Sequence, residues 1–161
     1  MDIVHDPDEI LRKKLSPITQ FNASLRKIVD EMKKSMVAHE GVGLSANQVG
    51  LDMALFIARP KEKFYVFINP DVELIGEADI KEEGCLSIPG TWGITKRVKK
   101  IRIKYQNLEG KKRTLTTEGF LAHIIQHEYD HITGVLFTDN ALELFDTPKP
   151  EPNNESPELN P

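Results

Sequence analysis

The chain has 161 residues, of which 39% are hydrophobic and 29% charged, with a formal net charge of −4 at pH 7. This length fits one domain with a proper core, and the balance of residue types is that of a globular protein. The negative charge argues against a DNA-binding surface or docking on an anionic membrane, and no run approaches the ~20 apolar residues that a membrane span needs.

The first quarter of the chain is predicted to be helical. The start, MDIVHD, lacks the basic residues and apolar run of a secretion signal, so we expect a cytoplasmic protein. A short helix is predicted over residues 8–15, after Pro7. A longer helix is predicted over residues 22–39, because Asn22 can cap it and apolar side chains recur every three or four residues. Its apolar face consists of Leu25, Ile28, Val29, Met32 and Met36.

Strands are predicted through the middle of the chain. Residues 53–58 (MALFIA) read as a buried strand and residues 63–69 as another that Pro70 ends, with shorter strands at 72–75 and 80–83. Over residues 100–105 basic and apolar side chains alternate, so Ile101, Ile103 and Tyr105 should face inward. Residues 107–110 form a predicted turn, after which residues 112–116 pair back as a hairpin.

A second strong helix is predicted over residues 118–133, capped by Thr117 and ended by Gly134. A helical turn is expected near residues 139–144. From residue 146 to 161 the chain holds five prolines, several acidic residues and no aromatic residue, which is typical of a disordered tail. We therefore expect one catalytic domain, residues 1–145, followed by a Pro-rich acidic tail.

The most informative stretch is QHEYDH, residues 126–131, inside the second helix. Residues four apart share one face of a helix, so His127 and His131 can meet one metal ion. Glu128 is rotated about 100° from His127 and can reach a metal-bound water. Apolar neighbours turn this face toward the core, where unpartnered polar groups would be costly. The expected fold is therefore α+β, with antiparallel strands packed around a metal-bearing helix in a single domain.

A catalytic metal site needs a third protein ligand, and Cys85 is the best candidate. His123 extends the series by four residues, but three imidazoles on one helix span two turns, about 11 Å, so His123 fits a pocket wall or a hydrogen-bonding role better. Downstream lie Glu143 and the acidic tail, with no further histidine. A lone cysteine is by itself most simply a small buried hydrophobe, although its thiolate is an excellent ligand for Zn²⁺ or Fe²⁺.

Three segments together resemble the signature motifs of the peptide deformylase family, and in the family's order. They are GVGLSANQ (residues 41–48), EGCLS (83–87) and QHEYDH (126–131). The start, with DPD at residues 6–8 followed by Leu11 and Arg12, is also similar to family N-termini. Two positions depart from the usual pattern: Ser45 stands where the first motif usually has alanine, and His123 where members often carry arginine or an apolar residue.

The resemblance implies a hydrolase that removes the N-formyl group from the N-terminal methionine of new polypeptides and releases formate. It implies Cys85, His127 and His131 as ligands of one divalent metal, Fe²⁺ in the cell, with Zn²⁺, Ni²⁺ or Co²⁺ as alternatives. Glu128 would be the general base and then the acid. The Gln48 side-chain amide and the Leu86 backbone N–H would stabilise the oxyanion. Substrate contacts are expected from Gly43, Leu44, Glu83 and His123.

Two alternative functions share parts of this pattern. A metalloprotease would use the same helical motif with a downstream ligand, and its metal would survive Cys85→Ser. A non-catalytic homologue would hold the metal structurally or bind peptides, but it should have lost Glu128 or Gln48, and both are present. The expected partners are N-formyl-methionyl nascent peptides, and the ribosome near its exit tunnel. Arg97 is expected to pair with Asp130 or to lie exposed in a basic strand.

Overall fold

The computed structural model describes residues 1–146, and the predicted tail lies almost wholly outside the described residues. Within that range the chain forms short 3₁₀ helices (η), α-helices and strands. In chain order they are η1 (Glu9–Arg12), α1 (Ala23–Ala38), β1 (Gly43–Ser45), η2 (Ala46–Val49), β2 (Leu55–Ala58), β3 (Tyr65–Cys85), β4 (Ile88–Gln106), β5 (Lys112–Glu118), α2 (Phe120–Ile132), α3 (Phe137–Asn140) and β6 (Glu143–Phe145).

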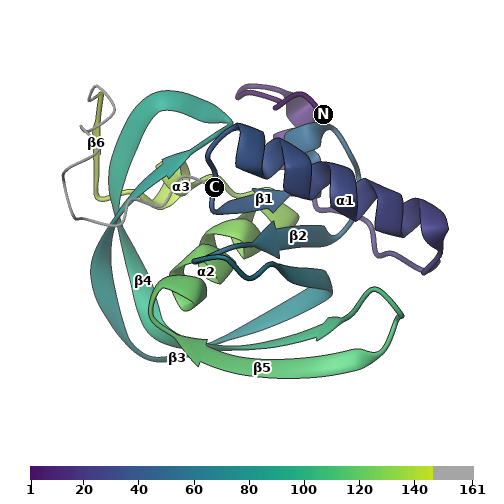
Figure 1. The fold of residues 1–161 in the computed structure, drawn as a ribbon. Helices are drawn as coiled ribbons and strands as arrows, with labels where there is room; N and C mark the ends of the chain where they lie inside the picture. The colour runs from purple at the N-terminus through teal and green to yellow at the C-terminus, as the bar shows by residue number, and fades with distance from the viewer. Residues whose placement is uncertain (147–161) are drawn as a thin grey trace.

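The strands form one antiparallel sheet wrapped around α2, which confirms the predicted α+β class. The order is β1-β2-β3-β4-β5, and β6 pairs with β4. Figure 1 shows α2 in the middle of the molecule, with β1 and β2 beside it, the long strands β3 to β5 curving below it, and α1 on the outer side of β1 and β2. The sheet therefore separates the two long helices.

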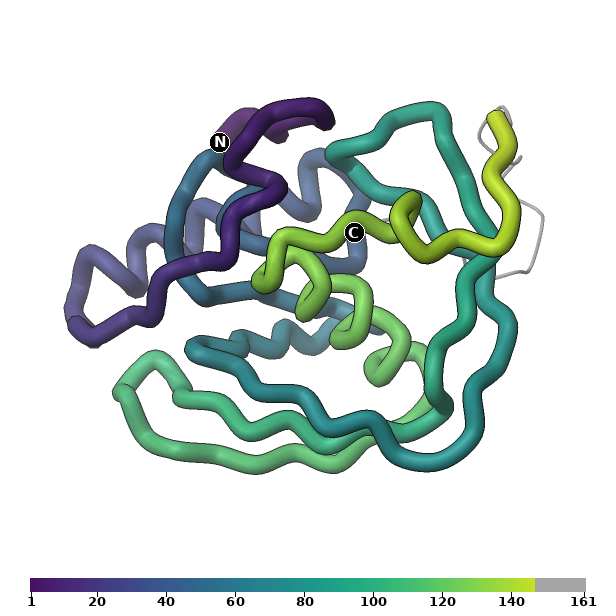
Figure 2. Tube along the Cα trace, turned by 180° about the vertical axis from the view of Figure 1, so that it is seen from behind, coloured from purple at the N-terminus to yellow at the C-terminus, as the bar shows by residue number. Residues whose placement is uncertain are grey.

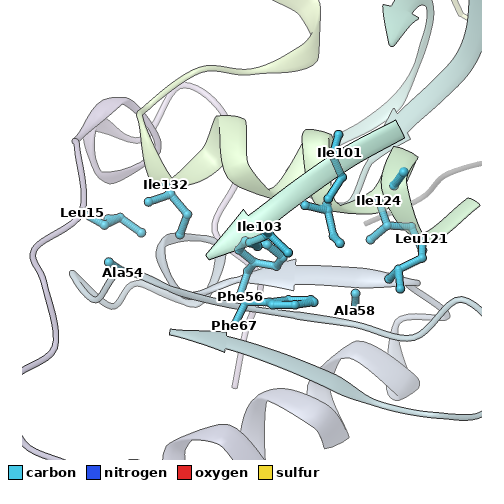
Figure 3. Close-up of a cluster of buried hydrophobic side chains, with 12 residues drawn as sticks. Leu15, Ala54, Phe56, Ala58, Phe67, Ile101, Ile103, Leu121, Ile124 and Ile132 are labelled. Carbon is cyan, nitrogen blue, oxygen red and sulfur yellow. The ribbon is translucent and has the colours of Figure 1, made fainter. Parts of the chain in front are cut away.

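Two buried clusters form the core, one on each side of β1 and β2. The first lies between the sheet and α2 and includes Phe56, Phe67, Ile101, Ile103 and Ile124 (Figure 3). The second lies under α1. As predicted, the inner face of α1 is apolar, and it buries Leu25, Val29, Met32 and Met36. Each such side chain contributes roughly 1.5–3 kcal/mol when fully buried, so the apolar pattern largely dictates which faces meet.

The predicted helix over residues 22–39 is confirmed as α1. The Asn22 side chain accepts a hydrogen bond from the backbone N–H of Leu25 at 3.0 Å, as an N-cap should. The early helix is shorter than predicted: only Glu9–Arg12 winds, as a 3₁₀ turn capped by Asp8. The inward positions of Ile101 and Ile103 are also confirmed, because both side chains are fully buried.

Three predicted boundaries are wrong. Pro70 does not end a strand: β3 continues to Cys85, since the pairing with β4 shifts register between Ile68 and Asp71 and this irregularity accommodates the proline. Helix α2 begins at Phe120 with Gly119 as its N-cap, because Thr117 pairs with β4 as part of β5. The expected turn at 139–144 is split into α3 and the short strand β6.

The N-terminal segment ties distant parts of the fold together. In Figure 2 this segment, in purple, runs alongside the end of α2. The backbone N–H of Leu15 donates to the carbonyl of Ile132 at 3.0 Å. The guanidinium of Arg12 forms two hydrogen bonds with the carboxylate of Asp139 in α3. The first residues thus fix the end of the helix that carries the two histidines.

Candidate metal centre

The structure brings Cys85, His127 and His131 together. Cys85 is the last residue of β3, and the histidines lie one turn apart on α2. All three side chains are buried, and their ligand atoms lie within 4.8 Å of one another. The Cys85 sulfur is 3.5 Å from Nε2 of His131, and the two imidazole ring centroids are 5.1 Å apart. His123 lies outside this cluster.

The chemistry of these groups fits a metal ion. Nε2 of His127 is buried without a hydrogen-bond partner among the described residues, a costly state in a dry interior, and Nε2 of His131 faces the Cys85 sulfur at 3.5 Å. Burial lowers the pKa of both imidazoles, which keeps them neutral, and raises the pKa of the Cys85 thiol. Neutral imidazole is the form that binds a metal, and a buried thiolate needs a cation beside it.

Glu83 orients the His127 ring. Its carboxylate is fully buried, and Oε2 accepts hydrogen bonds from Nδ1 of His127 at 2.7 Å and from Arg97 at 2.9 Å. Oε1 accepts from His123 at 2.9 Å and from Thr95 at 2.8 Å. Burial alone would favour the protonated acid, but the hydrogen bonds from Arg97, His123 and His127 hold the pKa of Glu83 well below its ordinary value. A proton on Nδ1 of His127 leaves Nε2 free for a metal.

Arg97 joins this support to α2 itself. Its guanidinium contacts Glu83 and also donates to the Asp130 carboxylate at 2.8 Å. The predicted Arg97–Asp130 pair is thus confirmed, and the alternative of an exposed basic side chain is wrong, because only 11% of the Arg97 side chain is exposed. The sequence does not distinguish Arg97 from the basic residues around it, although its neighbours Lys96, Lys99 and Lys100 are exposed to solvent.

Glu128 lies beside the cluster, fully buried. Its Oε2 accepts a hydrogen bond from the Ser45 hydroxyl at 2.8 Å, whereas Oε1 has no partner among the residues described. A Cβ atom on Gly43 would lie 2.6 Å from Oε1, so any larger residue would have to displace this carboxylate. Burial raises the pKa of Glu128 well above its ordinary value, and the Ser45 hydrogen bond opposes that rise.

Gln48 faces the same cluster from η2. Its side-chain carbonyl accepts a hydrogen bond from the backbone N–H of Ser45 at 3.0 Å. This leaves the amide NH₂ directed at the Cys85 sulfur, 3.5 Å away, and at the Ser87 hydroxyl, 3.2 Å away. Leu86 follows Cys85 in the turn between β3 and β4, half-buried. Two predicted oxyanion donors thus belong to segments that adjoin the cysteine.

The predicted substrate contacts are distributed around this centre. Gly43 and Leu44 lie on the edge strand β1, with Gly43 beside Glu128 and the Leu44 side chain buried in the second cluster. His123 has the expected hydrogen-bonding role, to Glu83, and also lines a cavity of about 340 Å³ at the start of α2. Lys81, Lys99 and Glu118 line the same cavity. The hydrogen bond from Ser45 to Glu128 was not predicted, since no periodicity relates residues so far apart in sequence.

Comparisons with known proteins agree with this geometry. The family model for polypeptide deformylase matches residues 1–145. The peptide deformylase of Symbiobacterium thermophilum is 43% identical over 148 residues, covering 89% of this chain and 68% of that protein. The enzyme of Thermoanaerobacter pseudethanolicus is 41% identical over 144 residues, covering 89% and 91%.

Solved structures show the same similarity in three dimensions. The peptide deformylase of Thermotoga maritima superposes with a TM-score of 0.85 at 37% identity, covering 88% of this chain and 97% of that one. The Synechococcus elongatus peptide deformylase in complex with actinonin gives a TM-score of 0.86 at 33% identity, covering 88% and 79%. The chain therefore belongs to the peptide deformylase family.

Proposed function

We propose that Cys85, His127 and His131 hold the metal of this enzyme and that Glu128 is its general base. As a member of the family, the chain is a metal-dependent hydrolase that removes the N-formyl group from the N-terminal methionine of new polypeptides and releases formate. One observation carries the assignment of residues. Among residues 1–146, one group of three side chains has the spacing of metal ligands, and it lies beside Glu128, whose buried Oε1 has no hydrogen-bond partner there.

The roles follow from the position of each side chain. When bound, a divalent metal supplies a water of lowered pKa. Glu128 takes the proton of this water at Oε1 while the water oxygen bonds to the formyl carbon. Glu128 later delivers the proton to the departing amine nitrogen, so that the C–N bond breaks and formate leaves. The Gln48 amide and the Leu86 backbone N–H donate hydrogen bonds to the formyl oxygen as it gains negative charge. Loss of one such donor typically costs about 3 kcal/mol in the barrier.

We propose that the peptide binds along β1. This strand lies at the edge of the sheet, where an extended peptide can add as a further strand. Gly43 has no side chain to keep the peptide backbone away. Leu44, the next residue of β1, is proposed to contact the peptide as well. His123 lines the neighbouring cavity and is proposed to contact the side chain of the first residue. The predicted contact from Glu83 has weaker support, because both of its oxygens already accept hydrogen bonds from protein groups.

We propose Fe²⁺ as the metal in the cell, because one thiolate and two imidazoles suit Fe²⁺ as well as Zn²⁺ and family resemblance favours iron. Metal analysis of protein purified without oxygen tests this choice. A preparation that holds stoichiometric zinc and no iron would contradict it.

We further propose a cytoplasmic enzyme that works near the ribosomal exit tunnel, since nascent formyl-methionyl chains emerge there. Within residues 1–146, no helix is long and apolar enough to cross a membrane. Co-sedimentation with ribosomes that carry a short nascent chain tests the location, and protein that stays in the supernatant would contradict it.

The decisive experiment measures formate release from a short N-formyl-methionyl peptide by anaerobically prepared, Fe²⁺-loaded protein. Glu128→Ala should abolish turnover while metal stays bound. Glu73→Ala, on the exposed face of β3, is the control and should keep full turnover. Cys85→Ser should release the metal, whereas retention would favour a metalloprotease. Turnover that is lost on chelation while the fold persists supports catalysis, and unfolding on chelation supports a structural metal.

A further inference from the structure

We propose that the Ser45 hydroxyl is a positioning group that holds the base Glu128 in its working orientation. This inference rests on the proposed function of Glu128. The structure places this hydroxyl beside the carboxylate of Glu128.

The Ser45 hydroxyl contacts Glu128 at two atoms. Ser45 is fully buried at the end of β1, where it is the N-cap residue of η2. Oγ instead lies 2.8 Å from Oε2 of Glu128 and 3.1 Å from the backbone carbonyl oxygen of the same residue. A hydroxyl carries one proton, so the shorter contact, to a carboxylate oxygen, is the stronger hydrogen bond.

This hydrogen bond gives the two carboxylate oxygens different roles. Oε2 is engaged by Ser45, whereas Oε1 has no partner among the residues that the structure describes. Gly43 leaves Oε1 the space it needs, because any Cβ there would lie 2.6 Å from it. The carboxylate is thus held on one side and left open on the other, which selects Oε1 as the oxygen that accepts and returns the proton.

Ser45 also fixes the base relative to the proposed oxyanion donor. Its backbone N–H donates to Oε1 of Gln48 at 3.0 Å while its hydroxyl holds Glu128. One rigid residue therefore sets the geometry between the group that moves the proton and the group that stabilises the developing charge. Removal of the hydroxyl leaves the link to Gln48 intact but frees Glu128 to rotate about its terminal torsion, which has broad preferences.

The test is Ser45→Ala in the Fe²⁺-loaded enzyme, assayed with N-formyl-methionyl peptide. We expect kcat to fall about tenfold, because a misdirected base loses part of its contribution. KM should stay within about twofold, because the buried Ser45 side chain bonds to Glu128 and is not proposed to contact the peptide. Bound metal should stay stoichiometric. Ser35→Ala is the matched control, since Ser35 is also buried but bonds to the backbone carbonyl of Met1, away from the site.

A second readout does not depend on turnover. Unfolding midpoints of the zinc-loaded protein are compared for Ser45→Ala, Glu128→Leu and the double variant. Ser45→Ala should lower the midpoint more in the wild-type background than in the Glu128→Leu background, where the hydroxyl has only a backbone carbonyl to bond. If the two substitutions shift the midpoint additively, the hydroxyl and the carboxylate do not interact, and the proposal is overturned.

The kinetic outcomes also separate this inference from the proposed function. Unchanged kcat in Ser45→Ala, an effect confined to KM, or metal lost in step with the rate would each refute the positioning role alone. Turnover that survives Glu128→Ala would instead refute the proposed base, and the inference with it.

Discussion

The His127 ring shows how single side chains prepare the site. Glu83 holds its Nδ1 edge, and the Phe137 ring lies 6.0 Å from its centroid at an interplanar angle of 27°. Two unrelated contacts therefore restrict the rotation of one proposed ligand. A ligand ordered before binding loses less freedom when the metal arrives, which strengthens the affinity.

Replacement of Glu83 by glutamine should weaken metal binding about 10–100-fold, because an amide presents one fewer acceptor to His127 and Arg97 and removes the buried charge. Competition with a chelator of known affinity measures this loss. Glu73→Gln, on the exposed face of β3, should bind metal like the wild type. Equal affinity in the Glu83 variant would contradict the orienting role.

Replacement of Gly43 by alanine should reduce kcat at least tenfold, since the new methyl group would meet both Oε1 of Glu128 and, at 2.9 Å, the side chain of Ile124. Steady-state assay measures the effect, and circular dichroism together with metal content verifies the fold. Wild-type kcat in this variant would mean that the base moves aside without cost.

Much of the site was predictable at this scale because its chemistry is local. The spacing of His127, Glu128 and His131 follows from helical geometry. The hydrogen bonds from Ser45 to Glu128 and from His123 to Glu83 join residues 83 and 40 positions apart, so no local pattern contains them. Such pairs become visible only when the strands have been placed around α2.

Among the elements, the helix ends and the long strands decide where the site residues lie. The periodicity that predicted α1 gave its bounds to within one residue at each end. The continuity of β3 through Pro70 was not predictable, because a register shift depends on the partner strand rather than on the sequence of β3. The late start of α2 has the same origin: Thr117 and Glu118 pair with β4 instead of entering the helix.

The end of α2 depends on Gly134. Its φ is +79°, and an added Cβ would lie 2.3 Å from the backbone oxygen of Arg12. Gly134→Ala should therefore lower the free energy of unfolding by more than the ~1 kcal/mol of left-handed strain alone. Urea unfolding measures it. Gly76→Ala is the matched control, because Gly76 has the same φ and nothing within 4 Å of its added Cβ. Equal losses would exclude the contact with Arg12.

For the whole molecule, one metal centre connects two layers. Cys85 comes from the sheet and the two histidines from the central helix, so a bound ion links the parts that enclose the first hydrophobic cluster. The proposed ligands, base and oxyanion donors all lie between Gln48 and His131, inside the predicted catalytic domain.

Truncation after Phe145 should leave kcat and KM within about twofold of the full chain. The proposed ligands, base and oxyanion donors all precede residue 145, and β6, the last strand among residues 1–146, pairs with β4 through Phe145 and Trp92. Parallel assay of the two proteins measures the difference. A tenfold loss in the shortened protein would assign the final residues a part in catalysis.

The hydrogen bonds that tie the N-terminal segment to α2 and α3 have a consequence for folding during synthesis. Arg12 and Leu15 are made early, but their partners Asp139 and Ile132 are made more than a hundred positions later. Until those residues emerge, the N-terminal segment lacks both of these partners. Contacts so distant in sequence form slowly and late. A newly made copy should therefore acquire activity only after nearly the whole described chain has left the ribosome.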